Sequence, residues 1–202
     1  MKLYGSRGPN PRRVRIFLAE KGIDLPETPI DLAKREQKSP DYLQKNSLGQ
    51  VPTLELDDGT TISETVAICR YFEELHPEPS LFGRSALEKA QVDMWVRRIE
   101  FQLMQPVQQF WRHAHPRTAA LVKQYTDFGE SNRAVYANAQ RWLDTELADG
   151  RQFLAGEALS MADICALSMI DFARVIGLDI EPDQPHLIAW HERISARPSA
   201  AA

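Results

Sequence analysis

The stretch SLGQVPTL at positions 47–54 decides the fold, because it places Pro52 inside a run that otherwise has the pattern of a β-strand. Proline has no N–H to donate to a sheet, so it is expected only in an edge strand or in a turn. An Asp-Asp-Gly turn signal follows at positions 57–59. The pattern predicts a β-hairpin formed by residues 51–56 and 60–62.

The segments before this hairpin alternate between strand and helix signals. Residues 2–5 predict a short strand, and a helix is expected to start at Asn10, with Asn10 as its N-cap and Pro11 in the first helical position. Gly22 supplies the matching stop signal. Two further patterns predict a second strand over residues 28–31 and a short helix over residues 41–45.

After the hairpin the pattern turns helical. Ser63 is expected to cap a helix with apolar positions at helical spacing, and Pro77, Pro79 and Gly83 then indicate a linker. The chain is thereby divided into a mixed α/β domain over residues 1–77, a linker over 78–84 and an all-helical domain over 85–202. Helices of the second domain are expected over residues 85–112, 118–147, 160–176 and 185–196.

The composition argues against several classes of function. The 202 residues carry a net charge of −4, which disfavours a nucleic-acid partner held through its phosphates. No apolar run approaches the roughly 20 residues that cross a bilayer, and the first residues are too polar for a signal peptide. We expect a cytoplasmic protein without a membrane partner. The two cysteines, Cys69 and Cys165, form no CxxC pair, and no metal site is expected.

Three stretches in register resemble the cytosolic glutathione transferase superfamily. They are SLGQVPTL at 47–54, ISETVAI at 62–68, and FLAG at 153–156 leading to SMADI at 160–164. The resemblance covers most of the chain. It implies a thioredoxin-like N-terminal domain, an all-α C-terminal domain and a homodimer. It also implies glutathione as co-substrate, together with a small apolar or electrophilic molecule.

The resemblance places glutathione on two elements. It implies a cis bond before Pro52, so that the N–H and C=O of Val51 face the cysteinyl unit of the ligand; from the residues alone, an edge-strand or turn proline is the alternative. Thr65 would bind the γ-glutamyl carboxylate at a helix N-terminus, and Glu64 the α-amino group. Simple capping of that helix by Ser63 is compatible with this binding role.

The glycyl end of the ligand has two candidate contacts. Gln50 occupies the position whose equivalent reaches this end in related classes, and Lys38 could pair with the glycyl carboxylate. For Lys38 and the neighbouring Lys34 and Arg35, a solvated charged loop is the alternative.

The catalytic position departs from the family pattern. Many classes place Tyr, Ser or Cys at the start of the first helix, where it stabilises the thiolate of glutathione. Alignment puts Gly8 there, and glycine has no side chain to donate. Pro9-Asn10 resembles the Pro-Asn of nu-class transferases, which makes Asn10 the catalytic candidate and helix capping its alternative. Ser6 is the second candidate, whereas Tyr4 is expected in the core.

The resemblance implies a pocket for the electrophile, lined by residues of the second domain: Phe101, Met104, Phe110 and Trp111. Packing in the core is the simpler role for at least half of these four residues. Ser160 and Asp163 are expected to form a capping box.

The implied activity is that of a glutathione transferase, with disulfide reductase or peroxidase activity as variants. The absence of a catalytic side chain at Gly8 keeps one alternative open, a non-catalytic binding module of the stress-response or translation-associated type.

Overall fold

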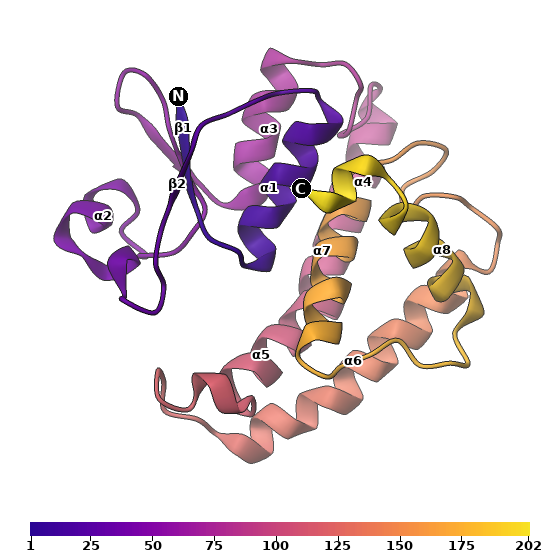
Figure 1. Ribbon diagram of the computed structural model, residues 1–202. Helices are drawn as coiled ribbons and strands as arrows, with labels where there is room; N and C mark the ends of the chain where they lie inside the picture. Colours follow the sequence, from indigo (N-terminus) through magenta and orange to yellow (C-terminus); the bar gives the residue numbers. More distant parts are fainter. The chain divides into compact units, whose positions relative to one another are not determined.

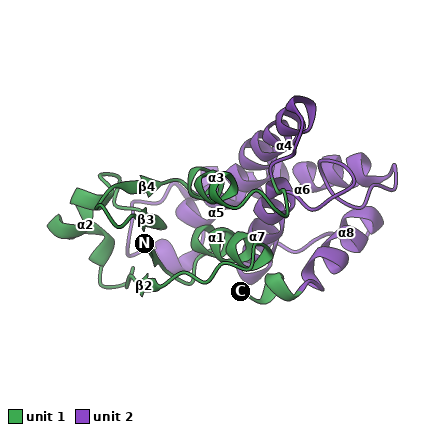
Figure 2. Ribbon diagram, turned by 90° about the horizontal axis from the view of Figure 1, so that it is seen from above, with its two compact units in different colours: residues 1–81, 198–202 green, residues 82–197 purple.

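A computed structural model describes all 202 residues and divides them into two compact units (Figures 1 and 2). Unit 1 comprises Met1–Leu81 and Pro198–Ala202, and unit 2 comprises Phe82–Arg197. The division lies within the stretch expected as a linker. The last five residues, expected in the helical domain, group instead with unit 1, because the backbone oxygen of Ala200 accepts a hydrogen bond from Arg12 at 2.8 Å.

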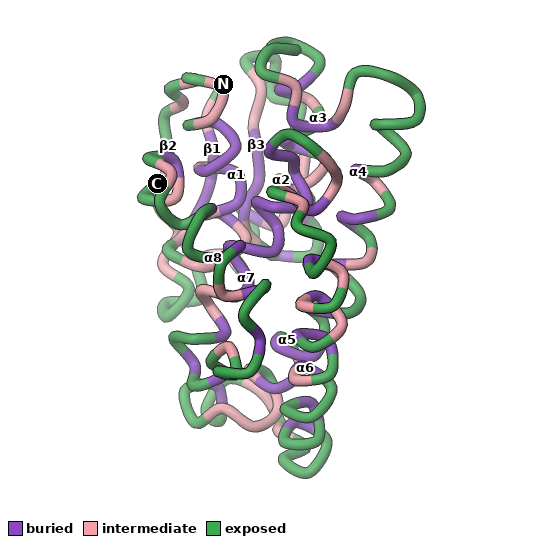
Figure 3. The backbone as a smooth tube through the Cα atoms, turned by 90° about the vertical axis from the view of Figure 1, so that its right-hand side faces the viewer, coloured by how far each residue is buried: buried purple, intermediate pink, exposed green.

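Unit 1 is a thioredoxin-like domain built on a four-stranded mixed sheet in the order β2-β1-β3-β4. β1 pairs in parallel with β2 and antiparallel with β3, which forms the predicted hairpin with β4. β1 and β3 are the most buried strands (Figure 3). The strands are β1 Lys2–Gly5, β2 Glu27–Pro29, β3 Thr53–Glu55 and β4 Thr61–Ser63, and the helices are α1 Pro9–Glu20, α2 Pro40–Lys45 and α3 Thr65–Leu75. α1 and α3 lie together on one side of the sheet and α2 on the other (Figures 1 and 2).

Helix α1 begins two residues earlier than predicted, at Pro9 rather than Pro11. Its N-cap is Gly8, with no side-chain cap, so the prediction of Asn10 as N-cap was wrong. The reason is Pro9, whose fixed φ suits the first helical position and whose missing N–H costs nothing there. The stop at Gly22 is confirmed: Gly22 has φ +66°, and the next N–H, of Ile23, bonds back to the carbonyl of Leu18 at 2.9 Å.

Helix α3 also begins differently from the prediction. Ser63 is the last residue of β4, where it pairs with Thr53, and it is therefore not the cap. The cap position belongs to Glu64, which has φ 68° and makes no side-chain capping bond. A positive φ is uncommon for a residue with a side chain and tends to occur at functional sites.

Unit 2 is all-helical, as predicted. Its helices are α4 Ala86–Arg98, a π-helical segment Ile99–Met104, α5 Gln105–His113, α6 Thr126–Leu147, α7 Met161–Val175 and α8 Pro185–Ser195. The π-helical segment ends two residues before Pro106, which has no N–H for a regular helical bond. The helix expected from residue 118 starts only at Thr126. The hydroxyl of Thr118 instead donates to the carbonyl of Trp111 at 2.7 Å, at the end of α5.

The core of unit 2 surrounds α7. The predicted capping box is confirmed: the carboxylate of Asp163 accepts from the backbone N–H and the hydroxyl of Ser160, at 3.0 and 2.8 Å. Its other oxygen accepts from the N–H of Leu154 at 2.8 Å and from the indole N–H of Trp190 at 3.1 Å. This carboxylate therefore ties the loop before α7 and helix α8 to the start of α7.

Candidate functional site

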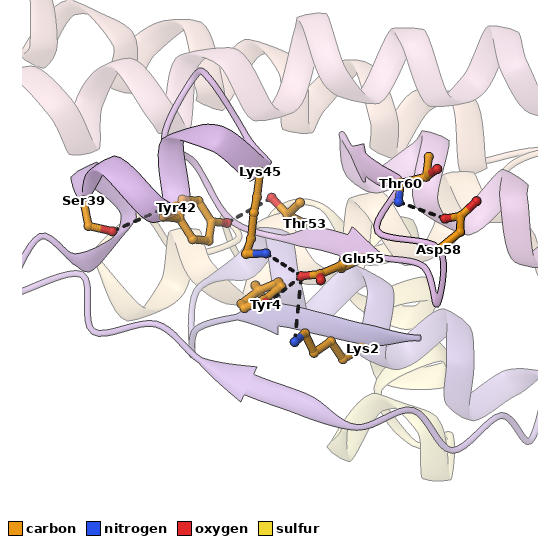
Figure 4. Close-up of polar contacts among 9 residues, drawn as sticks. All are labelled: Lys2, Tyr4, Ser39, Tyr42, Lys45, Thr53, Glu55, Asp58 and Thr60. Atoms are coloured by element: carbon orange, nitrogen blue, oxygen red, sulfur yellow. Dashed lines mark hydrogen bonds and ion pairs between the residues drawn. The ribbon is translucent and has the colours of Figure 1, made fainter.

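The turn before β3 is held in place by side chains of α2 and the loop after it. The Val51–Pro52 bond is cis, as predicted. The carbonyl oxygen of Gln50 accepts from the hydroxyl of Tyr42 at 2.7 Å and from the amide of Asn46 at 3.0 Å. Tyr42 also contacts the hydroxyl of Thr53 at 2.9 Å (Figure 4). Burial raises the pKa of Tyr42 above its ordinary value, so its phenol keeps the proton that it donates.

These bonds leave the backbone of Val51 available. Val51 lies between the anchored Gln50 and the buried Pro52, outside every ladder of the sheet. Neither its N–H nor its C=O has a hydrogen-bond partner within the chain. Buried backbone groups are almost always hydrogen-bonded. The free N–H and C=O of the half-buried Val51 are therefore suited to bind a ligand. The side chain of Gln50 is exposed beside it.

The loop that precedes this turn uses Lys38 and Gly49. The ammonium of Lys38 donates to the carbonyl of Leu48 at 2.8 Å. Gly49 has φ +58°, and a Cβ there would lie 2.6 Å from the carbonyl oxygen of Gln37 and 2.8 Å from the ammonium of Lys38. Lys38 therefore packs closely against Gly49, where only glycine leaves room for it. Lys34 is paired with Asp31 at 3.5 Å, as expected of a charged loop.

A second polar cluster ties α2 to the sheet (Figure 4). One carboxylate oxygen of Glu55 accepts from the hydroxyl of Tyr4 at 2.6 Å and from Lys45 at 2.7 Å, with Lys2 at 3.8 Å. The bond from Lys45 is the main reason why the pKa of Glu55 lies below its ordinary range. Tyr4 is buried in this cluster, and its hydroxyl is engaged with Glu55.

The start of α3 presents the second predicted element. Glu64 is exposed and Thr65 is buried, and the first helical hydrogen bond runs from Ile68 back to Glu64. The backbone N–H groups of the first turn therefore have no acceptor within the helix. The hydroxyl oxygen of Thr65 accepts from Arg13 on α1 at 3.4 Å. Free N–H groups and the positive end of the helix dipole favour an anion here.

Arg13 was not among the residues predicted from the sequence to belong to this site. It is only 2% exposed, on the face of α1 that it shares with Ile16 and Phe17. The available signal was its spacing, because positions i+3 and i+4 of a helix lie on the same face as position i. A charged residue at a core position of this helix required an explanation.

The start of α1 holds the two catalytic candidates. Ser6 follows β1, and its hydroxyl oxygen accepts from the N–H of Gly8 at 3.3 Å. Arg15 donates to the carbonyl of Ser6 at 3.1 Å. Asn10 lies in the first turn of the helix, and its carboxamide oxygen is buried without a hydrogen-bond partner. The side chain of Asn10 is therefore not consumed by capping.

A cavity of about 650 Å³ opens beside Ser6. Of the residues predicted to contact glutathione or to act in catalysis, it includes Ser6 alone. It therefore does not coincide with the elements at Val51 and Thr65. Its lining residues are Gly5, Ser6, Arg7, Arg15, Glu27, Pro29, Ile30 and Asp31.

The four residues expected in an electrophile pocket have different surroundings within unit 2. Met104 and Phe110 are buried in its core, and Arg133 stacks over the ring of Phe110 at 4.1 Å. Phe101 is 59% exposed. Trp111 is half-buried and packs edge-on against Phe172.

The structure contains neither a metal-binding cluster nor a membrane-spanning helix. It brings no three side chains of the kinds that bind metals close enough together to hold an ion. None of its helices combines the length and the apolar character that crossing a bilayer requires.

Two family models match most of the chain. Residues 8–75 match the N-terminal domain of glutathione S-transferases, and residues 112–198 match their C-terminal domain. Glutathione S-transferase 2 of Saccharomyces cerevisiae is 39% identical over 196 residues, which cover 95% of this chain and 84% of that protein.

Solved structures agree with this match. The crystal structure of Gtt2 from Saccharomyces cerevisiae superimposes with a TM-score of 0.93 and 37% identity, covering 100% of this chain and 99% of the other. A glutathione S-transferase-I bound with the ligand lactoylglutathione gives a TM-score of 0.84 at 27% identity, covering 99% of this chain and 96% of that chain.

Proposed function

The chain belongs to the glutathione S-transferase family, and from this membership we propose how its own residues bind glutathione and activate the thiol. It is an enzyme of the glutathione-transferase type, with glutathione as co-substrate. Binding is assigned to the turn at Gln50–Pro52 and to the start of α3. Activation of the sulfur is assigned to the start of α1.

One observation carries the binding proposal: the backbone N–H and C=O of Val51 have no partner in a turn that is otherwise firmly held. The cysteinyl unit of a peptide offers one C=O and one N–H, so it can pair with Val51 as a neighbouring strand would. The anchored carbonyl of Gln50 keeps Val51 in place without using its hydrogen-bonding groups. Little ordering is then needed on binding.

With the cysteinyl unit at Val51, the two ends of glutathione are assigned to the neighbouring polar groups. The γ-glutamyl carboxylate is assigned to the hydroxyl and free N–H groups of Thr65, and the α-amino group to Glu64, which is exposed beside it. The glycyl carboxylate is assigned to the exposed side chain of Gln50 and to Lys38. The bond from Lys38 to Leu48 uses one of its three hydrogens.

Activation of the thiol is assigned to Asn10. A free thiol has a pKa of about 8.5 and is mostly protonated at neutral pH, so a donor near the sulfur is needed to favour the thiolate. The carboxamide of Asn10 caps no helix, which leaves its NH₂ group free to donate. Ser6 is the second candidate: its oxygen accepts from Gly8, so its hydroxyl hydrogen is directed elsewhere.

The remaining parts of the proposal concern the second substrate and the assembly. An apolar electrophile is proposed as the acceptor, bound in part by Phe101 and Trp111, with detoxification in the cytoplasm as the role. The exposed Phe101 supports a ligand-facing position. A homodimer is proposed from family membership, and light scattering at micromolar concentration measures it directly. A monomeric mass would contradict it.

Titration calorimetry with glutathione, followed by the ultraviolet thiolate absorbance of the bound ligand against pH, tests the central proposal. We expect micromolar to millimolar binding and a bound thiol pKa below the free value of about 8.5. Absence of binding would contradict the whole assignment. Binding with an unshifted thiol pKa would retain the recognition site and contradict the activation step.

A further inference from the structure

Arg13 is a buried cation with an unusual position. Its side chain is 2% exposed and extends from α1 toward the first residue of α3, where its guanidinium donates to the hydroxyl oxygen of Thr65. Removing a guanidinium from water is costly unless its charge and donors are used. The N-terminus of α3 carries partial positive charge, so the helix dipole does not favour a cation at this end.

The bond from Arg13 determines what the hydroxyl of Thr65 can do. A threonine hydroxyl has one hydrogen and can accept through its oxygen. Because the oxygen already accepts from Arg13, the hydrogen is directed away from the guanidinium. Thr65 is 7% exposed, and its hydroxyl donates to no group of the chain. As the first residue of α3, Thr65 has no helical carbonyl four positions earlier to which a threonine commonly donates.

From this arrangement we propose that Arg13 is a positioning residue for the γ-glutamyl α-carboxylate of glutathione. It fixes the hydroxyl hydrogen of Thr65 toward that carboxylate, and its charge adds to the field of the helix N-terminus. The inference rests on the proposed function, since it requires the carboxylate to bind at Thr65. A hydroxyl that accepts from a cation is also a stronger donor, because hydrogen bonds in a chain polarise one another.

The test compares two ligands and two variants. The ligands are glutathione and the same peptide without its α-carboxylate, 4-aminobutyryl-cysteinyl-glycine. We expect Arg13→Met to raise the Kd for glutathione about tenfold, the size of a lost charge-assisted contact, and to change the Kd for the truncated peptide less than about twofold. Thr65→Val should lose affinity for glutathione to a similar extent. The double variant should bind no worse than Thr65→Val, because both changes remove one linked interaction.

Two variants control for the fold. Arg12→Met removes the same charge from the neighbouring position, where the guanidinium donates to Ala200, and should leave both dissociation constants unchanged. Arg13→Lys keeps the buried charge but moves the donor, and should raise the Kd for glutathione about threefold. As with Arg13→Met, the Kd for the truncated peptide should change less. Thermal unfolding shows whether each variant is folded. Steady-state rates should show a higher KM for glutathione at an almost unchanged kcat.

The outcomes separate this inference from the proposal on which it rests. Equal losses for the two peptides, or additive losses in the double variant, would mean that Arg13 has only a structural role. If the natural chain binds the two peptides equally well, the carboxylate does not bind at Thr65 and the inference fails while glutathione binding stands. If the natural chain binds neither peptide, the proposed function fails as well.

Discussion

The turn at residues 48–52 and the start of α1 at residues 6–10 are two backbone segments of unit 1 that differ in how their polar groups are paired. In the turn, side chains of Lys38, Tyr42 and Asn46 bond to backbone groups of Leu48 and Gln50. The start of α1 has no side-chain cap, and the carboxamide oxygen of Asn10 is buried without a partner. One segment is fixed by its neighbours, and the other carries an unsatisfied polar group.

The difference separates recognition from activation. A rigid turn with free backbone groups suits a peptide ligand, because its shape must exist before the ligand arrives. A side chain that meets a developing thiolate must instead keep a donor uncommitted until the sulfur is present. Changes in the turn should therefore lower stability and affinity together. Changes at Asn10 should lower turnover without lowering stability.

The largest effect on stability is expected from Asn46→Ala. The side chain of Asn46 is 6% exposed, donates to the carbonyl of Gln50 and accepts from the N–H of Leu48. Losing both bonds should lower the free energy of unfolding by about 2–4 kcal/mol, because the N–H of Leu48 loses its partner and the carbonyl of Gln50 keeps only the bond from Tyr42. The Kd for glutathione should rise at least tenfold because the turn loosens. Urea unfolding and calorimetry measure the two effects.

Asn132→Ala is a matched control in unit 2. Asn132 is also buried, at 8% exposure, and its amide donates to the carbonyl of Phe128 at 2.7 Å. It should lower stability by about 1 kcal/mol and leave the Kd for glutathione unchanged. If both variants changed affinity equally, the turn would have no special role in recognition.

A smaller effect on stability, of opposite sign, is expected from Asn10→Ala. Removing a buried acceptor without a partner should leave the free energy of unfolding unchanged or raise it by up to about 1 kcal/mol, whereas loss of a helix cap would lower it by about 1 kcal/mol. Turnover with an aromatic halide should fall about tenfold or more, and the pKa of the bound thiol should rise.

The comparison variant for Asn10 is Ser6→Ala, which removes the second candidate donor. Turnover, thiol pKa and glutathione affinity are measured for the natural chain and both variants. The affinity of Asn10→Ala for glutathione should stay within about twofold of the natural value. Unchanged turnover and thiol pKa in Asn10→Ala would show that the catalytic assignment is wrong. A loss confined to Ser6→Ala would transfer the role to Ser6.

The same contrast explains how much the sequence could predict. The stop at Gly22 and the capping box at Asp163 were predictable, because each depends on local chemistry within a few residues. The cis bond at Pro52 was predictable only from the resemblance to the family, since the residues alone favour an edge-strand or turn proline. The starts of α1 and α3 were predicted one or two residues away from their positions. At α1 a second proline, Pro9, was available for the first helical turn.

For two other features, local patterns could not identify the contact that decides their role, because the partner lies in a distant segment. Ser63 resembles a helix cap until its pairing with Thr53 in the sheet is known. Arg13 resembles one member of a basic run until α1 and α3 are packed together. Charged residues at buried helix positions are therefore the part of such a site that sequence patterns most readily miss.

The smallest effect concerns Glu55, which ties α2, and with it the turn at residues 48–52, to the sheet. Its folded-state pKa lies below the ordinary value because of bonds from Lys45 and Tyr4. A depressed carboxylate pKa stabilises the folded state above the unfolded pKa, and this contribution is lost as the pH falls through the folded pKa. Glu55→Gln should therefore be slightly less stable than the natural chain at pH 7, and the difference in stability should shrink as the pH falls toward 3. Thermal unfolding between pH 7 and pH 3 measures this convergence, and a difference independent of pH would mean that the carboxylate charge does not stabilise the turn.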